Sequence, residues 1–127
     1  MVKEAYVSFE VAKLLKKKGF DEPCRLFYKD TQAGLYEFKN APKAYKDNPN
    51  NPCFLAPSLY MTMKWLRKKY YIYADPIKQG NYNDCSEYYT YIVARMGIIH
   101  RNSSVADKLS YEEAVEAALK YSLENLI

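Results

Sequence analysis

The sequence predicts an α+β fold, a two-layer domain in which three helices cover an antiparallel sheet of about four strands. Three observations predict this class. The last segment opens with a helix capping box, two earlier segments have helical periodicity, and short runs rich in aromatic and β-branched residues lie between them. Short connections between the runs imply hairpins and therefore antiparallel pairing. The expected order is α-β-β-α-β-β-α, with helices segregated on one face of the sheet.

Length and composition indicate one soluble globular domain spanning residues 1–127. The chain is 49% hydrophobic and 27% charged, which is ordinary for such proteins. No apolar run approaches the roughly 20 residues that span a bilayer, and the first residues lack the apolar core of a secretory signal. The three cysteines are odd in number and widely spaced, which favours reduced thiols over a disulfide framework. We therefore expect a cytoplasmic protein with no membrane partner.

The first helix is expected over residues 8–18. Ser8 is a good N-cap, and Gly19 is placed to take the left-handed conformation that ends many helices. Phe20 can then fold back on Leu15, which is the hydrophobic contact of a Schellman ending.

A hairpin is expected after the first helix. Its strands are predicted at residues 24–28 and 35–38, joined by a short polar connection that contains Gly34. Residues 40–52 hold three prolines and four asparagines, which disfavour both helix and strand, so a loop is expected there.

The second helix is expected to begin near Pro57, because proline is favoured at the first helical position. Met61 and Trp65, four residues apart, form a second apolar patch away from the main stripe. The main stripe comprises Leu59, Thr62, Met63, Leu66 and Tyr70.

Runs rich in tyrosine and β-branched residues predict the strands of the second half of the sheet. Asp75-Pro76 is expected to end one strand, and Gly97 to break or bulge another. The strands are expected at residues 71–74, 88–95 and 98–99, with loops over 77–86 and 102–107.

The last helix is expected from Ser110 to the end of the chain. Ser110 and Glu113 have the spacing of a capping box, and Glu112 adds negative charge to the first turn, which the helix dipole favours. One stripe is apolar and should dock on the sheet; it comprises Tyr111, Ala114, Val115, Ala118, Leu119, Ser122 and Leu126.

The net charge of +4 is unevenly divided along the chain. Residues 1–69 carry 14 basic and 7 acidic side chains, whereas residues 70–127 carry 5 and 8. The basic runs 16–18 and 67–69 both fall at predicted helix ends, where cations favour the dipole. We prefer this structural interpretation to an anionic partner such as nucleic acid, because the pI near 8.8 is below that of most basic binding domains.

Several blocks of the sequence resemble a family of short proteins from gut Bacteroidales and their phages or mobile elements. The resemblance is carried by residues 11–16, 18–24, 56–67, 111–121 and 123–127, including Met63-Lys64-Trp65-Leu66-Arg67, and it covers about half the chain. It implies a bacterial intracellular setting linked to phages. It implies no activity, cofactor or site residue.

Nothing in the sequence favours catalysis or a metal. His100 is the only histidine; Cys24, Cys53, Cys85, Ser103 or Ser104 could supply a nucleophile and Asp84 or Asp107 an orienting carboxylate, but no spacing supports a triad. No zinc spacing and no glycine-rich phosphate loop is present. We therefore expect no enzyme activity, no cofactor and no metal.

Two features suggest an interaction surface. Tyr71 and Tyr73 share one face of their predicted strand, and Tyr89 and Tyr91 share one face of theirs. If the strands pair and the helices cover the other face, the four form an open tyrosine platform.

Such a platform could bury against a second copy or another protein, or stack single-stranded nucleic acid. Cross-strand pairing on a solvated face, or a place in the core, would explain the tyrosines without a function. Met61 with Trp65 is either a buried helix contact or an exposed anchor for a partner. The preferred hypothesis is a non-enzymatic protein-interaction module, with a homodimer as one form; nucleic-acid binding is the alternative.

Overall fold

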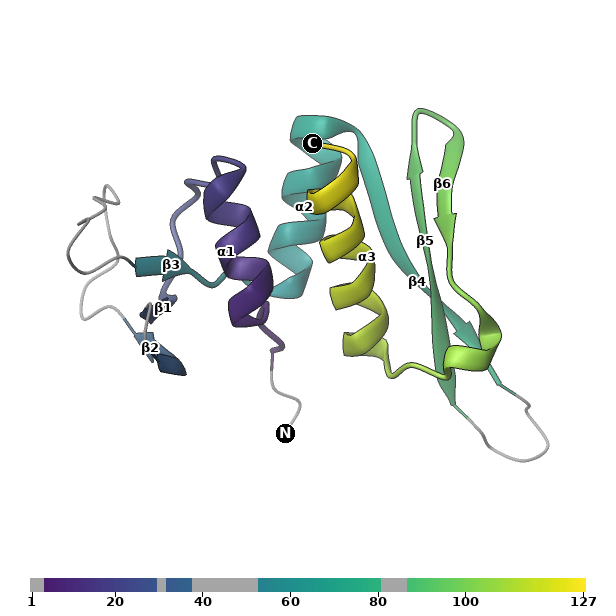
Figure 1. The fold of residues 1–127 in the computed structure, drawn as a ribbon, viewed down its shortest axis with the longest axis horizontal. Coiled ribbons are helices and arrows are strands. Elements are labelled where there is room, and N and C mark those ends of the chain that lie inside the picture. Colours follow the sequence, from purple (N-terminus) through teal and green to yellow (C-terminus); the bar gives the residue numbers. More distant parts are fainter. Residues whose placement is uncertain (1–3, 30–31, 38–52, 81–86) are drawn as a thin grey trace. The chain divides into compact units, whose positions relative to one another are not determined.

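The computed structural model describes residues 4–29, 32–37, 53–80 and 87–127 (Figure 1). These residues form three α-helices and two three-stranded antiparallel sheets. The predicted α+β class is confirmed, but the strands form two sheets and not one sheet of about four. The chain divides into two compact units, residues 1–58 and 59–127, which we describe separately. The assignment of residues 1–127 to one domain stays a prediction.

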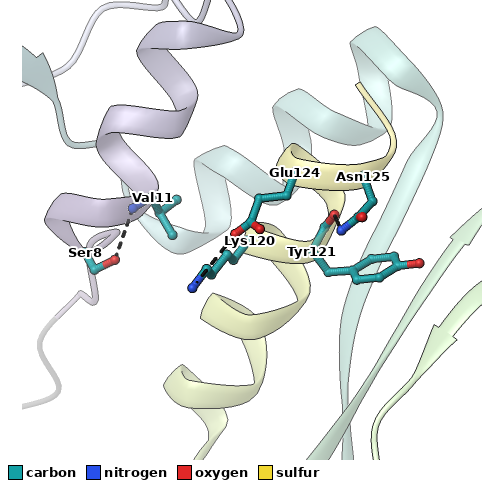
Figure 2. Close-up of polar contacts among 6 residues, drawn as sticks. All are labelled: Ser8, Val11, Lys120, Tyr121, Glu124 and Asn125. Atoms are coloured by element: carbon teal, nitrogen blue, oxygen red, sulfur yellow. Dashed lines mark hydrogen bonds and ion pairs between the residues drawn. The ribbon is translucent and has the colours of Figure 1, made fainter.

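The first helix of the N-terminal unit is α1 (Phe9–Lys17), and both of its ends follow the sequence prediction. The Ser8 side chain accepts from the Val11 N–H at 3.3 Å (Figure 2). At the other end Gly19 has a φ of +85°. The Phe20 N–H donates to the Leu15 carbonyl at 2.9 Å, as in a Schellman ending.

The N-terminal sheet contains β1 (Leu26–Lys29), β2 (Gln32–Glu37) and β3 (Cys53–Leu55), in the order β2-β1-β3. The predicted β1–β2 hairpin is confirmed. Strand β3 was not predicted, because three residues after a proline-rich stretch show no periodicity. The whole of the predicted loop over 40–52 lies outside the described residues. The buried Tyr28 hydroxyl donates to the Val7 carbonyl at 2.8 Å and ties the segment before α1 to β1.

The C-terminal unit places two helices on one side of its sheet (Figure 1). Both α2 and α3 pack on β4, α3 also packs on β5, and the two helices contact each other. The strand order is β4-β5-β6. The elements are α2 (Leu59–Tyr70), β4 (Ile72–Gln79), β5 (Tyr88–Arg95), β6 (Ile98–Asn102), the short 3-10 helix η1 (Val105–Asp107) and α3 (Tyr111–Asn125).

Three predicted boundaries in this half of the chain are wrong. Strand β6 continues to Asn102, three residues past its predicted end at Ile99. Strand β4 continues through Asp75 and Pro76 to Gln79, because an edge strand has one side without ladder hydrogen bonds and so tolerates proline. Helix α2 begins two residues after Pro57. The Pro57 carbonyl instead accepts from the Val7 N–H at 3.1 Å, and Ser58 forms a β-bridge with Tyr6.

Helix α3 has the predicted capping box. The Ser110 hydroxyl accepts from the Glu113 N–H at 3.1 Å, and the Glu113 carboxylate accepts from the Ser110 N–H at 2.9 Å. The bond from the Ser110 N–H to the carboxylate, followed by the interaction of the Ser110 hydroxyl with the same carboxylate, lowers the pKa of Glu113. The buried stripe is Ala114, Val115, Ala118, Leu119, Ser122 and Leu123, and burying each leucine contributes about 1.5–3 kcal/mol.

The last turns of α3 carry polar contacts on the exposed side. Lys120 lies 3.9 Å from Glu124, and the Asn125 side chain donates to the Tyr121 carbonyl at 3.0 Å (Figure 2). The ion pair is exposed and therefore contributes well under 1 kcal/mol.

We predict that Ser110→Ala lowers the free energy of unfolding by about 1 kcal/mol, because the Glu113 N–H loses its cap. Urea denaturation followed by circular dichroism measures this. Ser104→Ala, which removes a similar cap from the exposed η1, should cost less. Equal losses in the two variants would contradict the role given to the α3 cap.

The pH dependence follows from the lowered pKa of Glu113. The Glu113 carboxyl has a lower pKa in the folded state than in the unfolded state, so it stabilises the fold at pH values above its unfolded-state pKa. This contribution is lost as the pH falls through the folded-state pKa. Glu113→Gln should therefore be destabilising at pH 7 and close to neutral at pH 2. A loss that is constant between these pH values would be contrary to this prediction.

Candidate interaction surface

The β4–β5 register separates the four tyrosines of the predicted platform. Tyr73 lies opposite Ala94, while Tyr91 lies opposite Pro76 and Tyr89 opposite Lys78. Directly paired residues share a face, so Tyr73 projects from one face of the sheet and Tyr89 and Tyr91 from the other. The predicted platform of Tyr71, Tyr73, Tyr89 and Tyr91 is therefore not formed.

Tyr89 and Tyr91 lie on the face that α3 covers. The Tyr89 ring packs edge-on against Tyr111 of α3, with ring centres 5.4 Å apart. Tyr91 is buried, and its hydrogen bond to Arg101 raises the pKa of that guanidinium. Arg101 in turn lies 5.8 Å from the centre of the Tyr121 ring. These two tyrosines thus have a structural explanation in the contact between sheet and helix.

The second predicted feature paired Met61 with Trp65, but the two side chains differ in burial. Met61 is 37% exposed, whereas Trp65 is 7% exposed. The Trp65 ring contacts Tyr70 edge-on at 5.3 Å, and the Lys69 ammonium lies 5.4 Å from its centre. Trp65 is therefore a buried helix residue, and the reading of it as an exposed anchor is wrong.

The other two tyrosines belong to an exposed apolar surface at one end of the C-terminal unit. Tyr73, Ala94 and Ile99 form one row across the three strands, on the face that the helices leave open. Ile72, Arg95 and Ile98 form the next row, which projects from the opposite face. The β5–β6 turn lies just beyond that row (Figure 1), and Tyr71 immediately precedes Ile72 in the chain. We call this surface the hairpin end; its apolar side chains, each at least half exposed, are Tyr71, Tyr73, Met96, Ile98 and Ile99.

Two of these residues have unusual backbone conformations. Tyr71 has a φ of +59° and Met96 a φ of +52°. Glycine or asparagine is preferred after a helix in this conformation, and Asn-Gly in a two-residue hairpin turn such as Met96-Gly97. A left-handed conformation costs other residues about 1 kcal/mol or more. The Tyr71 side chain is 60% exposed and the Met96 side chain 76% exposed. Within the described unit, these side chains therefore gain little burial energy to offset the backbone cost.

Cations lie in the segments that lead into the hairpin end. Arg67, Lys68 and Lys69 occupy the last turn of α2, immediately before Tyr71. Arg95 flanks the turn and donates to the Leu126 carbonyl at 3.1 Å, which places the end of α3 at the same end of the unit. The combination of exposed apolar side chains with nearby cations is suited to contact with another molecule.

The sequence analysis identified Tyr71 and Tyr73 but missed Met96, Ile98 and Ile99. Gly97 was interpreted as a break or bulge, although a two-residue Met-Gly connection between two apolar runs is also a hairpin signal. A hairpin reading would have placed Met96 at the exposed turn.

The residues considered as nucleophiles have structural partners where the structure describes them. The Ser103 hydroxyl accepts from the Tyr91 N–H at 2.8 Å, and the Ser104 hydroxyl caps η1. Cys24 is buried, and burial followed by the nearby Glu22 charge raises its pKa to about 12. Cys85 and Asp84 lie outside the described residues. Within the described ranges, no three histidine, cysteine or acidic side chains gather as metal ligands would.

We predict that Cys24 resists a thiol reagent at pH 8, because a thiol with a pKa near 12 is almost fully protonated and is shielded. The measurement is the rate of labelling by 5,5′-dithiobis(2-nitrobenzoate) in the C53S/C85S variant. Labelling should be slow in buffer and fast in 8 M urea. Fast labelling in buffer would show an accessible, activated cysteine and contradict the structure.

Comparison with known proteins adds no functional information. No protein-family model, curated protein or solved structure matches the chain. Among the described residues, none of the helices has the length and apolar character needed to cross a bilayer. The hairpin end is therefore the feature of the described structure that calls for a functional explanation.

Proposed function

We propose that the chain is a non-enzymatic protein-interaction module and that the hairpin end is its contact surface. In line with the sequence resemblance, we place it in the cytoplasm of gut Bacteroidales, as a product of their phages or mobile elements. One observation carries the contact proposal. Two large, exposed residues, Tyr71 and Met96, occupy neighbouring positions where the backbone favours glycine or asparagine.

The surrounding residues support the same surface. Tyr73 and Ile99 add two exposed apolar side chains on one face of the sheet, and Ile98 adds one on the other face, all within two rows of the turn. Aromatic residues and methionine are enriched at protein interfaces, whereas scattered single apolar residues are ordinary on any surface. Burial of the Tyr71 and Met96 side chains in a complex would offset the free-energy cost of their left-handed backbone conformation.

Photo-cross-linking tests the proposal. A benzoylphenylalanine at position 96 is compared with one at position 64 in cells that encode the protein. Lys64 is also exposed but lies in the middle of α2, away from both ends of the sheet. We expect discrete, protease-sensitive adducts from position 96 and none from position 64.

Two outcomes would overturn the proposal. The absence of adducts at position 96, or identical adducts at both positions, would show that the hairpin end is not a specific contact surface. Adducts removed by nuclease and not by protease would favour the nucleic-acid alternative.

A further inference from the structure

We propose that the partner of the hairpin end is the opposite end of a second copy, so that C-terminal units associate head to tail. This inference rests on the proposed function and names the occupant of the same surface. It begins from the far end of the sheet, which carries an excess of carboxylates and one exposed aromatic side chain, Tyr111.

The far end is defined by the start of β5 and the start of α3. The Tyr89 N–H donates to the Leu109 carbonyl at 2.7 Å, which joins the two segments. The Tyr89 hydroxyl donates to the Glu87 carboxylate at 2.7 Å. This hydrogen bond, with burial and the neighbouring Glu87, Tyr111 and Glu112, raises the pKa of Tyr89. We call the surface formed by Glu87, Tyr89, Tyr111, Glu112 and Glu113 the acidic end.

The two ends are far apart on the unit. The β4–β5 ladder runs through eight residue pairs, from Ile72↔Arg95 at the hairpin end to Gln79↔Tyr88 at the acidic end. At about 3.4 Å per residue, the ends are separated by roughly 24 Å. One copy therefore cannot bring its own two surfaces together without unfolding the sheet.

The surfaces match in charge and in apolar character. At the hairpin end, Arg67, Lys68 and Lys69 lie in the last turn of α2, immediately before the exposed Tyr71. The acidic end presents three carboxylates beside Tyr111, which is 45% exposed. Opposed charges of this kind fix register and raise the association rate.

Other charged side chains do not reverse this polarity. Lys108 at the acidic end lies 6.0 Å from the Tyr88 ring, and Glu124 near the hairpin end is paired with Lys120. Lys78, directly opposite Tyr89, is a second cation at the acidic end, so the three carboxylates there lie near two lysines. The remaining charged or titratable groups on the same strands and connections are Asp75, His100, Arg101 and Asp107.

Charge complementarity favours head-to-tail over head-to-head association. A head-to-head dimer would bring the Arg67, Lys68 and Lys69 clusters of two copies together, and like charges repel. A head-to-tail contact leaves one hairpin end and one acidic end unoccupied in each dimer. Such heterologous contacts continue into rings or filaments as the concentration rises.

Charge reversal in the full-length chain tests the arrangement by sedimentation velocity in 50 mM NaCl. We expect the wild type to form concentration-dependent oligomers that dissociate in 500 mM NaCl, since salt screens exposed charges. Lys68→Glu alone and Glu112→Lys alone should each raise the dissociation constant about tenfold or more. Lys64→Glu, an exposed cation earlier in α2, is the matched control and should leave it unchanged.

The decisive step is to mix the two variants. Lys68→Glu keeps an intact acidic end and Glu112→Lys keeps an intact hairpin end, so the mixture should associate with an affinity within about threefold of the wild type. Failure of the mixture to associate would contradict the head-to-tail arrangement, and a head-to-head dimer predicts that Glu112→Lys alone still associates. Either of these results would overturn the proposal.

A strictly monomeric wild type at the highest soluble concentration would also overturn it. Thermal melting of each variant, compared with the wild type, distinguishes loss of contact from loss of folding. Position-96 adducts with a different protein, together with a monomeric wild type, would reject head-to-tail association and leave the proposed function standing. Absence of both adducts and oligomers would reject both.

Discussion

The antiparallel register of β4 against β5 determines which side chains of the C-terminal unit are buried and which are exposed. By pairing Ile72 with Arg95, it places Ile72, Ala74 and Val93 on the face covered by the helices. The same pairing moves Tyr73 to the opposite face from Tyr89 and Tyr91. It also brings the end of α2 beside the β5–β6 turn, so residues distant in sequence form the hairpin end. A shift of one residue would exchange the two faces and bury the wrong side chains.

The sequence predicts those features that depend on neighbouring residues. Ser8, Gly19 and Ser110 are local capping signals, and the structure confirms each of them. Strand β5 also matches its predicted limits, because its run of aromatic and β-branched residues is long and uninterrupted. The α+β class follows from the alternation of such elements, although the division of the strands between two sheets does not.

The sequence could not predict features that depend on strand register or edge position. The division of the tyrosines required the β4–β5 pairing, and the passage of β4 through Pro76 required knowing that β4 is an edge strand. Trp65 was ambiguous because its helical position allows either burial or exposure. The sequence predicted part of the hairpin end, namely Tyr71 and Tyr73. Met96 was missed because Gly97 was interpreted as a break or bulge and not as part of a turn.

The central claim is that Met96 serves contact with another molecule and not the stability of the chain itself. The free energy of unfolding of Met96→Asn tests it most directly, with Met61→Asn as a helical control that should be destabilising. Because asparagine adopts a positive φ more easily, we expect Met96→Asn to raise the free energy of unfolding by about 1 kcal/mol. A clear decrease would show that the Met96 side chain stabilises the fold, and it would contradict the claim.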